Sequence, residues 1–201
     1  MTHSVIYACS HRRGGNSDRA AQLLAQAVTE AGGSAEVIYL RNHTVLPCLA
    51  CGHCDEAHMK QGKARCVLGE QDDAYALFSP LFTARTVFFT APIYFYHLPS
   101  LFKTWIDRSQ QFWTAKHTGE PWIADLPKRT AHTVLHAGRP TGDKLFDGAT
   151  LTLKYFLHSF NLTLATPLVF RGLDHRDDLK AAPSFEQQIL DLGRTASASA
   201  Q

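Results

Sequence analysis

Stretches typical of buried β-strands alternate with stretches typical of helices along most of this 201-residue chain. Several of the strand-like stretches are apolar or β-branched throughout, as in Thr-Val-Phe-Phe-Thr at residues 86–90. Strands of this kind are covered on both faces, as they are in a parallel sheet between two layers of helices. The alternation therefore predicts a three-layer α/β fold, and no repeat or interdomain linker interrupts it.

The hydrophobic periodicity predicts where the individual elements lie. We expect strands at residues 4–8, 35–40, 86–90, 130–136 and 164–170. We expect helices at residues 18–31, 72–82, 98–112, 144–160 and 184–192. A doubly wound five-stranded parallel sheet of order 2-1-3-4-5 accommodates this succession, and its ligands bind where the strand order reverses, between strands one and three. The loops that follow Ala8 and Thr90 are therefore the expected binding site.

Composition and charge limit the domain organisation and the partners. With 45% hydrophobic and 19% charged residues, the chain is expected to form one domain over residues 1–194. That domain would carry a Cys-rich loop insertion at 41–71, and the Ala/Ser-rich residues 195–201 would fray. The formal net charge is only +2 and the basic residues are scattered, which argues against a nucleic-acid partner. The apolar runs are shorter than a membrane span and no signal-peptide pattern opens the sequence, so we expect a cytoplasmic protein without a membrane partner.

The loop after the first strand has the features of an anion-binding site. Residues 10–17 read Ser-His-Arg-Arg-Gly-Gly-Asn-Ser and lead directly into a predicted helix. A helix N-terminus offers unpaired backbone N–H groups and the positive end of the helix dipole to a phosphate. An ordinary polar turn that caps the helix is the alternative. The residues expected to hold the phosphate are Ser10, Arg12, Gly15, Asn16 and Ser17.

Two further loops are expected to reach the same site. Residues 91–99 follow the third strand and are rich in proline and aromatic side chains, which suit a flat ring such as a flavin. The alternative is that these aromatic side chains only fill the core. The loop after the fourth strand is the third candidate. The residues expected to contact the ring are Pro92, Ile93, Tyr94, Phe95, His136, Ala137 and Gly138.

Four of the five cysteines lie within nineteen residues of one another. Cys48, Cys51 and Cys54 are each separated by two residues, and Cys66 follows after eleven more. Thiolates with such spacing can converge on a [4Fe–4S] cluster or a tetrahedral zinc ion. Free thiols are a third alternative in a reducing compartment, and the spacing leaves all three open.

Two blocks of the sequence resemble a known family. The pattern Ser-x-Arg-x-Gly-Gly-Asn-Ser after the first strand resembles the flavin-phosphate loop of NADPH-dependent FMN reductases, in the flavodoxin-like superfamily. Residues 91–96 and 101–108, Ala-Pro-Ile-Tyr-Phe-Tyr and Leu-Phe-Lys-Thr-Trp-Ile-Asp-Arg, are similar to a block of iron–sulfur flavoproteins and related FMN reductases. The first three cysteines follow the iron–sulfur flavoprotein pattern, whereas the fourth cysteine of that family comes sooner than Cys66 does here.

The resemblance implies a flavodoxin-like fold and an enzyme that uses FMN. Its expected activity is that of an NAD(P)H-dependent flavin oxidoreductase that passes electrons to a flavin, a quinone or another small acceptor. The alternative is an iron–sulfur flavoprotein that carries electrons, with a [4Fe–4S] cluster on Cys48, Cys51, Cys54 and Cys66 and a ferredoxin as partner. The resemblance also implies a homodimer or homotetramer. No residue presents itself as an essential acid or base, so none is assigned as catalytic.

Overall fold

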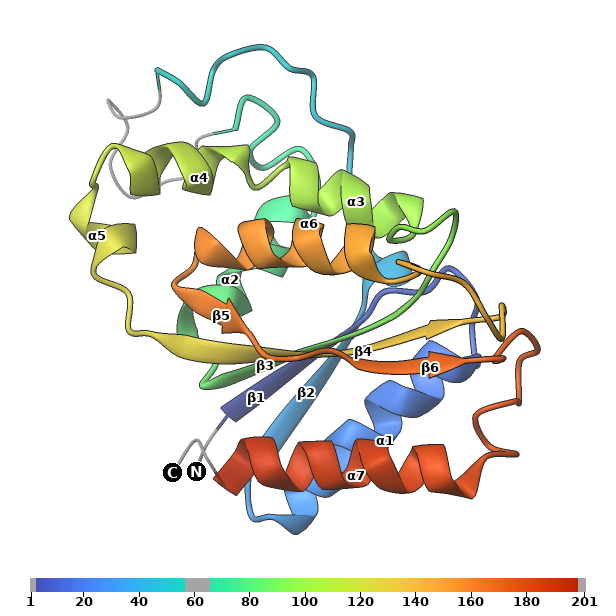
Figure 1. Ribbon diagram of the computed structural model, residues 1–201. Helices are drawn as coiled ribbons and strands as arrows, with labels where there is room; N and C mark the ends of the chain where they lie inside the picture. Colours follow the sequence, from blue (N-terminus) through green and yellow to red (C-terminus); the bar gives the residue numbers. More distant parts are fainter. Residues whose placement is uncertain (1–2, 57–65, 199–201) are drawn as a thin grey trace.

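The computed structural model describes residues 3–56 and 66–198, and its centre is a parallel sheet between two layers of helices (Figure 1). The strand order is β2-β1-β3-β4-β5, with β6 also paired to β4, and every pair is parallel. This is the flavodoxin-like order, and it confirms the prediction. The strands are β1 (His3–Ala8), β2 (Ser34–Tyr39), β3 (Thr86–Pro92), β4 (Arg129–Ala137), β5 (Leu162–Leu164) and β6 (Leu168–Arg171).

The predicted fifth strand is two short strands in the structure. β5 pairs with the beginning of β4, where Arg129 lies beside Leu162, and β6 pairs with its end, where Ala137 lies beside Arg171. Pro167 falls between them and has no N–H to give to the sheet. The proline therefore divides the strand, and the described part of the chain forms a six-stranded sheet instead of a five-stranded one.

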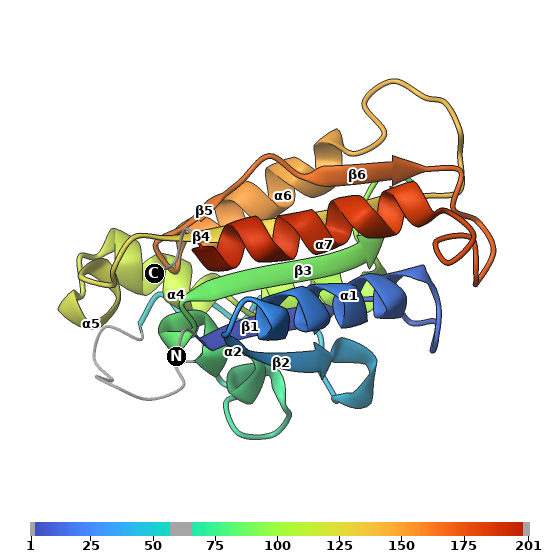
Figure 2. The ribbon, with the colours of Figure 1, turned by 90° about the horizontal axis from the view of Figure 1, so that it is seen from below.

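The helices cover both faces of the sheet. α1 (Asn16–Glu30) and α7 (Pro183–Ala198) lie side by side on one face (Figures 1 and 2). The opposite side carries α2 (Ala74–Thr83), α3 (Ser100–Asp107), α4 (Gln110–His117), α5 (Pro121–Ala124) and α6 (Asp147–His158). A short 3₁₀ turn, η1 (Leu40–Asn42), follows β2. None of the described helices has the length and apolar character needed to cross a bilayer.

The apolar runs of the strands supply two cores. In β1, Val5 and Tyr7 belong to the core beneath α2, α3 and α6, whereas Ile6 and Ala8 belong to the core beneath α1 and α7. All four side chains are fully buried. Because successive side chains of a strand point to opposite faces, a strand covered on both sides carries a nearly continuous apolar run.

Two helix predictions differ from the structure. The predicted helix at 98–112 is divided near Arg108 into α3 and α4, where the Arg108 guanidinium forms a buried ion pair with Asp72 at 2.5 Å. The segment after residue 112, for which no helix was predicted, contains the rest of α4 and all of α5.

The frayed tail is also corrected in part. Residues 195–198 belong to α7, and the Ser197 hydroxyl is buried and donates to the carbonyl oxygen of Gly193 at 2.8 Å. A Cβ atom on Gly193 would lie 2.7 Å from Cβ of Ala27, so this glycine lets α7 pack closely on α1. That packing orders the end of the helix. Residues 199–201 lie outside the described residues.

Candidate functional site

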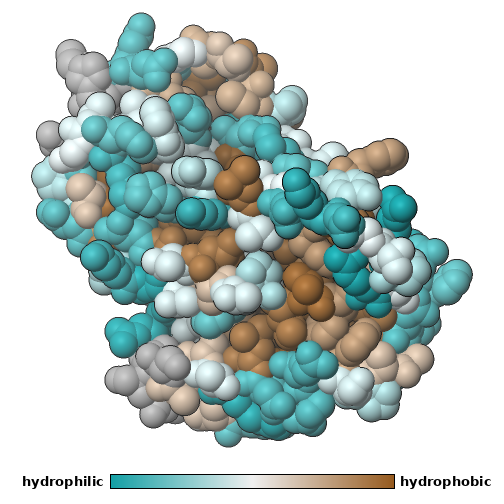
Figure 3. All heavy atoms as spheres, in the orientation of Figure 1, coloured by the Kyte–Doolittle hydropathy of each residue, from teal (hydrophilic) through white to brown (hydrophobic). Residues whose placement is uncertain are grey.

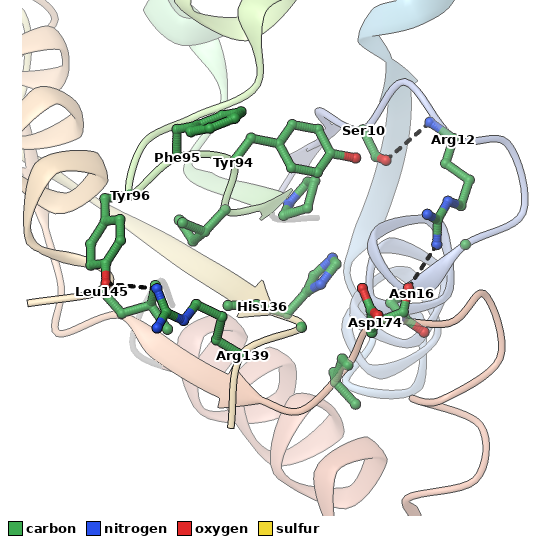
Figure 4. Close-up of a pocket in the computed structure, with 16 residues that line it drawn as sticks. Ser10, Arg12, Asn16, Tyr94, Phe95, Tyr96, His136, Arg139, Leu145 and Asp174 are labelled. Carbon is green, nitrogen blue, oxygen red and sulfur yellow. Dashed lines mark hydrogen bonds between the residues drawn. The ribbon is translucent and has the colours of Figure 1, made fainter. Parts of the chain in front are cut away.

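A cavity of about 560 Å³ opens at the carboxyl ends of β1, β3 and β4 (Figure 4). The parallel register places Ala8 beside Thr90 and Pro92 beside His136, so the three loops that follow these strands meet at one edge of the sheet. The position is the point where the strand order reverses, which is where doubly wound sheets bind ligands. The volume lies within the range of about 300–1,000 Å³ that small-molecule sites occupy.

The cavity wall contains most of the residues that the sequence predicts for the site. Every one of them lines it except Ser17. The predicted lining residues are Ser10, Arg12, Gly15, Asn16, Pro92, Ile93, Tyr94, Phe95, His136, Ala137 and Gly138. Five lining residues were not predicted: Tyr96, Arg139, Leu145, Leu173 and Asp174. For Tyr96 and Arg139 a signal existed, because each directly follows a predicted residue in the sequence.

One end of the cavity is rich in hydrogen-bond donors. Gly15 is the N-cap of α1, and no described side chain caps the helix through a hydrogen bond there. The hydroxyl of Ser10 accepts the backbone N–H of Arg12 at 3.1 Å, and the Arg12 guanidinium donates to the carbonyl oxygen of Asp174 at 3.0 Å (Figure 4). A helix N-terminus and an exposed arginine together favour an anion at this end.

Asn16 and Ser17 use their side chains within the protein. The Asn16 amide donates to the carbonyl oxygen of His175 at 2.9 Å and accepts the backbone N–H of Leu179 at 3.1 Å. Ser17 is buried, with its hydroxyl oxygen 2.8 Å from Nε2 of His136. The first side chain therefore holds the loop after β6 against α1, and the second joins α1 to β4. Of these two residues only Asn16 lines the cavity.

His136 is a buried neutral imidazole. Burial and, to a lesser degree, the charge of Arg12 lower the pKa of His136 to about 4, against an opposing interaction with the backbone of Leu173. Its carbonyl oxygen accepts the backbone N–H of Ile93 at 2.8 Å, which ties the loop after β3 to the end of β4. Near neutral pH the ring therefore carries no charge and can serve only as a hydrogen-bond partner.

The other end of the cavity is a strained aromatic turn. Tyr94 and His97 exchange backbone hydrogen bonds at 2.9 Å, and between them Phe95 and Tyr96 adopt φ angles of 49° and 62°. Such two-residue turns normally carry asparagine and glycine, and a side chain in the left-handed region costs roughly 1–2 kcal/mol. Phe95 is fully exposed, so no packing within the described chain offsets its strain. Strain of this kind is typical of ligand sites.

The turn is supported from the side of α6. The Nε2 atom of His97 lies 3.0 Å from the Thr152 hydroxyl, and a Cβ atom on Gly148 would lie 2.9 Å from the carbonyl oxygen of Tyr96. Arg139 donates to the Tyr96 hydroxyl at 3.1 Å (Figure 4). These contacts hold the backbone of the turn and the Tyr96 side chain in place beside the cavity.

The four clustered cysteines line a second, smaller cavity of about 220 Å³. Burial and, to a lesser degree, the neighbouring Cys66, Cys48 and Cys51 together raise the pKa of Cys54 to about 11. In the two described segments, however, no three His, Cys, Asp or Glu side chains are grouped so that they could hold a metal ion. The four cysteines thus line one cavity, but the described residues do not support the cluster or zinc alternatives.

Comparison with known proteins points to one family. The sequence profile of the family described as NADPH-dependent FMN reductase matches residues 1–123. The iron-sulfur flavoprotein of Methanosarcina thermophila is 27% identical over 100 residues, which are 50% of this chain and 48% of that protein. The match thus spans about half the length of this relative.

Solved structures share the fold along nearly the whole chain. The azoreductase of Bacillus anthracis str. Sterne has a TM-score of 0.65 at 14% identity, over 98% of this chain and 99% of that one. The NAD(P)H:quinone oxidoreductase from Methanothermobacter marburgensis has a TM-score of 0.64 at 18% identity, over 98% and 93%. At these identities the likeness establishes the architecture alone.

Proposed function

This chain belongs to the NADPH-dependent FMN reductase family, and we propose that it is an FMN-dependent oxidoreductase that oxidises NAD(P)H and reduces a small acceptor. The acceptor class that we propose is a flavin, a quinone or a related aromatic compound. The observation that carries the proposal is the cavity, with an anion-binding end at α1 and a strained aromatic turn at the other. The solved structures with this fold include a quinone oxidoreductase and an azoreductase, which accords with such an acceptor.

The residues of the cavity fit FMN by their chemistry. We propose that Ser10, Arg12 and the backbone of residues 15–17 bind its phosphate, because the donors and the positive charge gather there. Asp174 offers a carboxylate on the same wall, suited to the hydroxyl groups of the ribityl chain. The proposed ring contacts are Pro92, Ile93, Tyr94, Phe95, His136, Ala137 and Gly138. When bound, FMN supplies the hydride- and electron-transfer chemistry, and the protein orients it.

The chain's own contribution is binding and orientation. The hydrogen bond between the Ile93 N–H and the His136 carbonyl sets the distance between the two loops that flank the ring position. His136 is neutral and its Nε2 atom is paired with Ser17, so we assign it no proton transfer. Phe95, exposed at the mouth, shields one side of the cavity from water in this proposal.

The test is a titration and a turnover assay on the full chain. We expect one FMN per chain, and oxidation of NADH or NADPH that depends on added quinone, free flavin or azo dye. Arg12→Ala should bind FMN more weakly while the fold persists. Protein fully loaded with FMN that oxidises neither nucleotide with any of these acceptors would overturn the proposal.

An iron–sulfur electron carrier is the second candidate. Its support is that Cys48, Cys51, Cys54 and Cys66 line one cavity, and that the Methanosarcina relative is an iron-sulfur flavoprotein. The grouping of these thiols does not fit a metal in the described residues, so the reductase stands first. Iron and sulfide analysis after anaerobic purification separates the two. About four irons per chain, the content of one cubane, would favour the carrier and a ferredoxin partner, and FMN without iron the reductase.

We also propose that the protein works in the cytoplasm as a homodimer or homotetramer. Apolar side chains are visible on the face that carries α6, β5 and β6 (Figure 3), and the large exposed ones on these elements include Leu151, Tyr155 and Val169. Exposed apolar surface of this kind is typical of interaction sites. Light scattering of the FMN-loaded protein measures the assembly, and a monomer at all concentrations would contradict it.

A further inference from the structure

A buried ion pair lies beneath the loop that forms the donor-rich end of the cavity. Asp18, in the first turn of α1, accepts the backbone N–H of Gly14 at 2.7 Å. Arg41, in η1 after β2, donates to both carboxylate oxygens of Asp18, at 2.7 and 2.8 Å. The Asp18 and Arg41 side chains are only 5% and 11% exposed. The first turn of α1 and the η1 turn after β2 are thus joined by a two-point contact.

The position of Asp18 is unexpected for an anion site. Its carboxylate helps to shape the loop, because Gly14 has a left-handed φ of 63° and gives its N–H to Asp18. A negative charge in the first turn also suits the helix dipole. Yet the same charge would repel a phosphate bound by this loop, and the repulsion between like charges is strong where water is excluded.

Arg41 removes that conflict. Its two-point contact cancels the charge of Asp18 and leaves the carboxylate free to accept the Gly14 N–H. The same guanidinium donates to the carbonyl oxygen of Ser10 at 3.3 Å, and its central carbon lies 4.7 Å from the centre of the Tyr39 ring. One side chain therefore contacts both ends of the loop from outside the cavity.

We propose that Arg41 is a positioning residue for the phosphate of FMN. It neutralises Asp18, so that Asp18 orders the loop at Gly14 without repelling the phosphate, and it fixes the Ser10 backbone at the entrance of the loop. Arg41 does not line the cavity, so it acts through Asp18 and Ser10 and not by contact with the cofactor. This inference rests on the proposed FMN function.

The test compares FMN with riboflavin, which has the same ring and side chain but no phosphate. Dissociation constants for both are measured by flavin fluorescence on the full chain freed of flavin. Arg41→Gln should weaken the binding of FMN about tenfold, which equals about 1.4 kcal/mol. It should change the dissociation constant of riboflavin less than about twofold.

Three variants separate charge from architecture. The double variant Asp18→Asn/Arg41→Gln keeps an acceptor for the Gly14 N–H but carries no charge at either position. It should restore the affinity for FMN to within about threefold of the wild type. Arg41→Lys keeps the charge and should retain most of the affinity. The matched control is Arg19→Gln on α1, where Arg19 pairs with Glu186 at 2.6 Å. This variant also loses one positive charge, and it should leave the affinity for FMN unchanged.

The outcomes distinguish this inference from the proposed function. Wild-type protein that fails to bind FMN overturns the function and this inference with it. If the wild type binds FMN but Arg41→Gln weakens FMN and riboflavin equally, Arg41 is merely structural. The inference also fails if the double variant stays as weak as Arg41→Gln. If Arg41→Gln does not fold, the test uses Arg41→Lys and the double variant. In each of them the ratio of the FMN affinity to the riboflavin affinity must match that of the wild type, and a lower ratio contradicts the inference.

Discussion

The hydroxyl oxygen of Ser17 lies 2.8 Å from Nε2 of His136, which joins the first turn of α1 to the end of β4. The contact passes over β3, where the Thr90 hydroxyl donates to the carbonyl oxygen of Ser17 at 2.9 Å. All three residues are buried. The edge of the sheet that carries the cavity is therefore held by polar contacts between segments far apart in the sequence.

The burial of His136 predicts that stability depends on pH below neutrality. The pKa of His136 is about 4 in the folded protein and about 6.5 in an unfolded chain, so the unfolded state binds the proton more tightly. The contribution of neutral His136 to the free energy of unfolding is complete above about pH 6.5 and is lost as the pH falls toward 4. Urea unfolding should show a loss of about 2 kcal/mol between pH 7 and pH 5 that His136→Gln removes. An equal loss in wild type and variant would refute the assignment.

The exposed arginine at the cavity should act on the phosphate. Arg12→Ala is expected to weaken FMN by about ten- to hundredfold, the effect of losing a charge-assisted hydrogen bond, and to leave riboflavin nearly unchanged. Flavin fluorescence measures both constants. Arg13→Ala is the matched control, because Arg13 is also exposed but does not line the cavity. If the two variants bind FMN equally well, Arg12 does not hold the phosphate.

The strained turn predicts opposite effects on stability and binding. Phe95→Gly should stabilise the protein by about 1 kcal/mol, because glycine adopts a positive φ without strain. The same variant should weaken the binding of FMN, because it lacks the phenyl ring of Phe95. Phe95→Ala keeps the strain, so it should weaken FMN to the same degree without the gain in stability. Thermal unfolding without flavin and FMN titration provide the two readouts. Unchanged FMN affinity in both variants would show that Phe95 does not contact the cofactor.

Gly138 is expected to tolerate no side chain. A Cβ atom there would lie 2.7 Å from Oδ1 of Asp174, so Gly138→Ala should displace this carboxylate and cost about 1–3 kcal/mol. Adding Asp174→Gly to that variant makes room and should recover most of the stability, as measured by urea unfolding. A double variant no more stable than Gly138→Ala would place the strain elsewhere.

Local sequence was sufficient for the order of elements and for the edge that carries the cavity. Most positions of the central strands are apolar or β-branched, and polar or turn-forming residues follow them, so β1 to β4 and the loops after Ala8 and Thr90 could be predicted. The division between β5 and β6 also had a local signal in Pro167. The break at Arg108 had none, because it accompanies an ion pair with Asp72, 36 positions away.

The fold and the loops of the cavity were thus determined by the sequence, through periodicity and turn residues that act over a few positions. What each polar side chain contacts was decided only by the tertiary structure. The composition of the loop predicted phosphate donors in Asn16 and Ser17, but the parallel register brings His175 and His136 within hydrogen-bonding distance of them. The pairing of Arg41 with Asp18 arises in the same way, because β2 lies beside β1 and places η1 next to the start of α1. Hydrogen bonds and ion pairs depend on distances of a few ångströms, and only the packed sheet sets those distances.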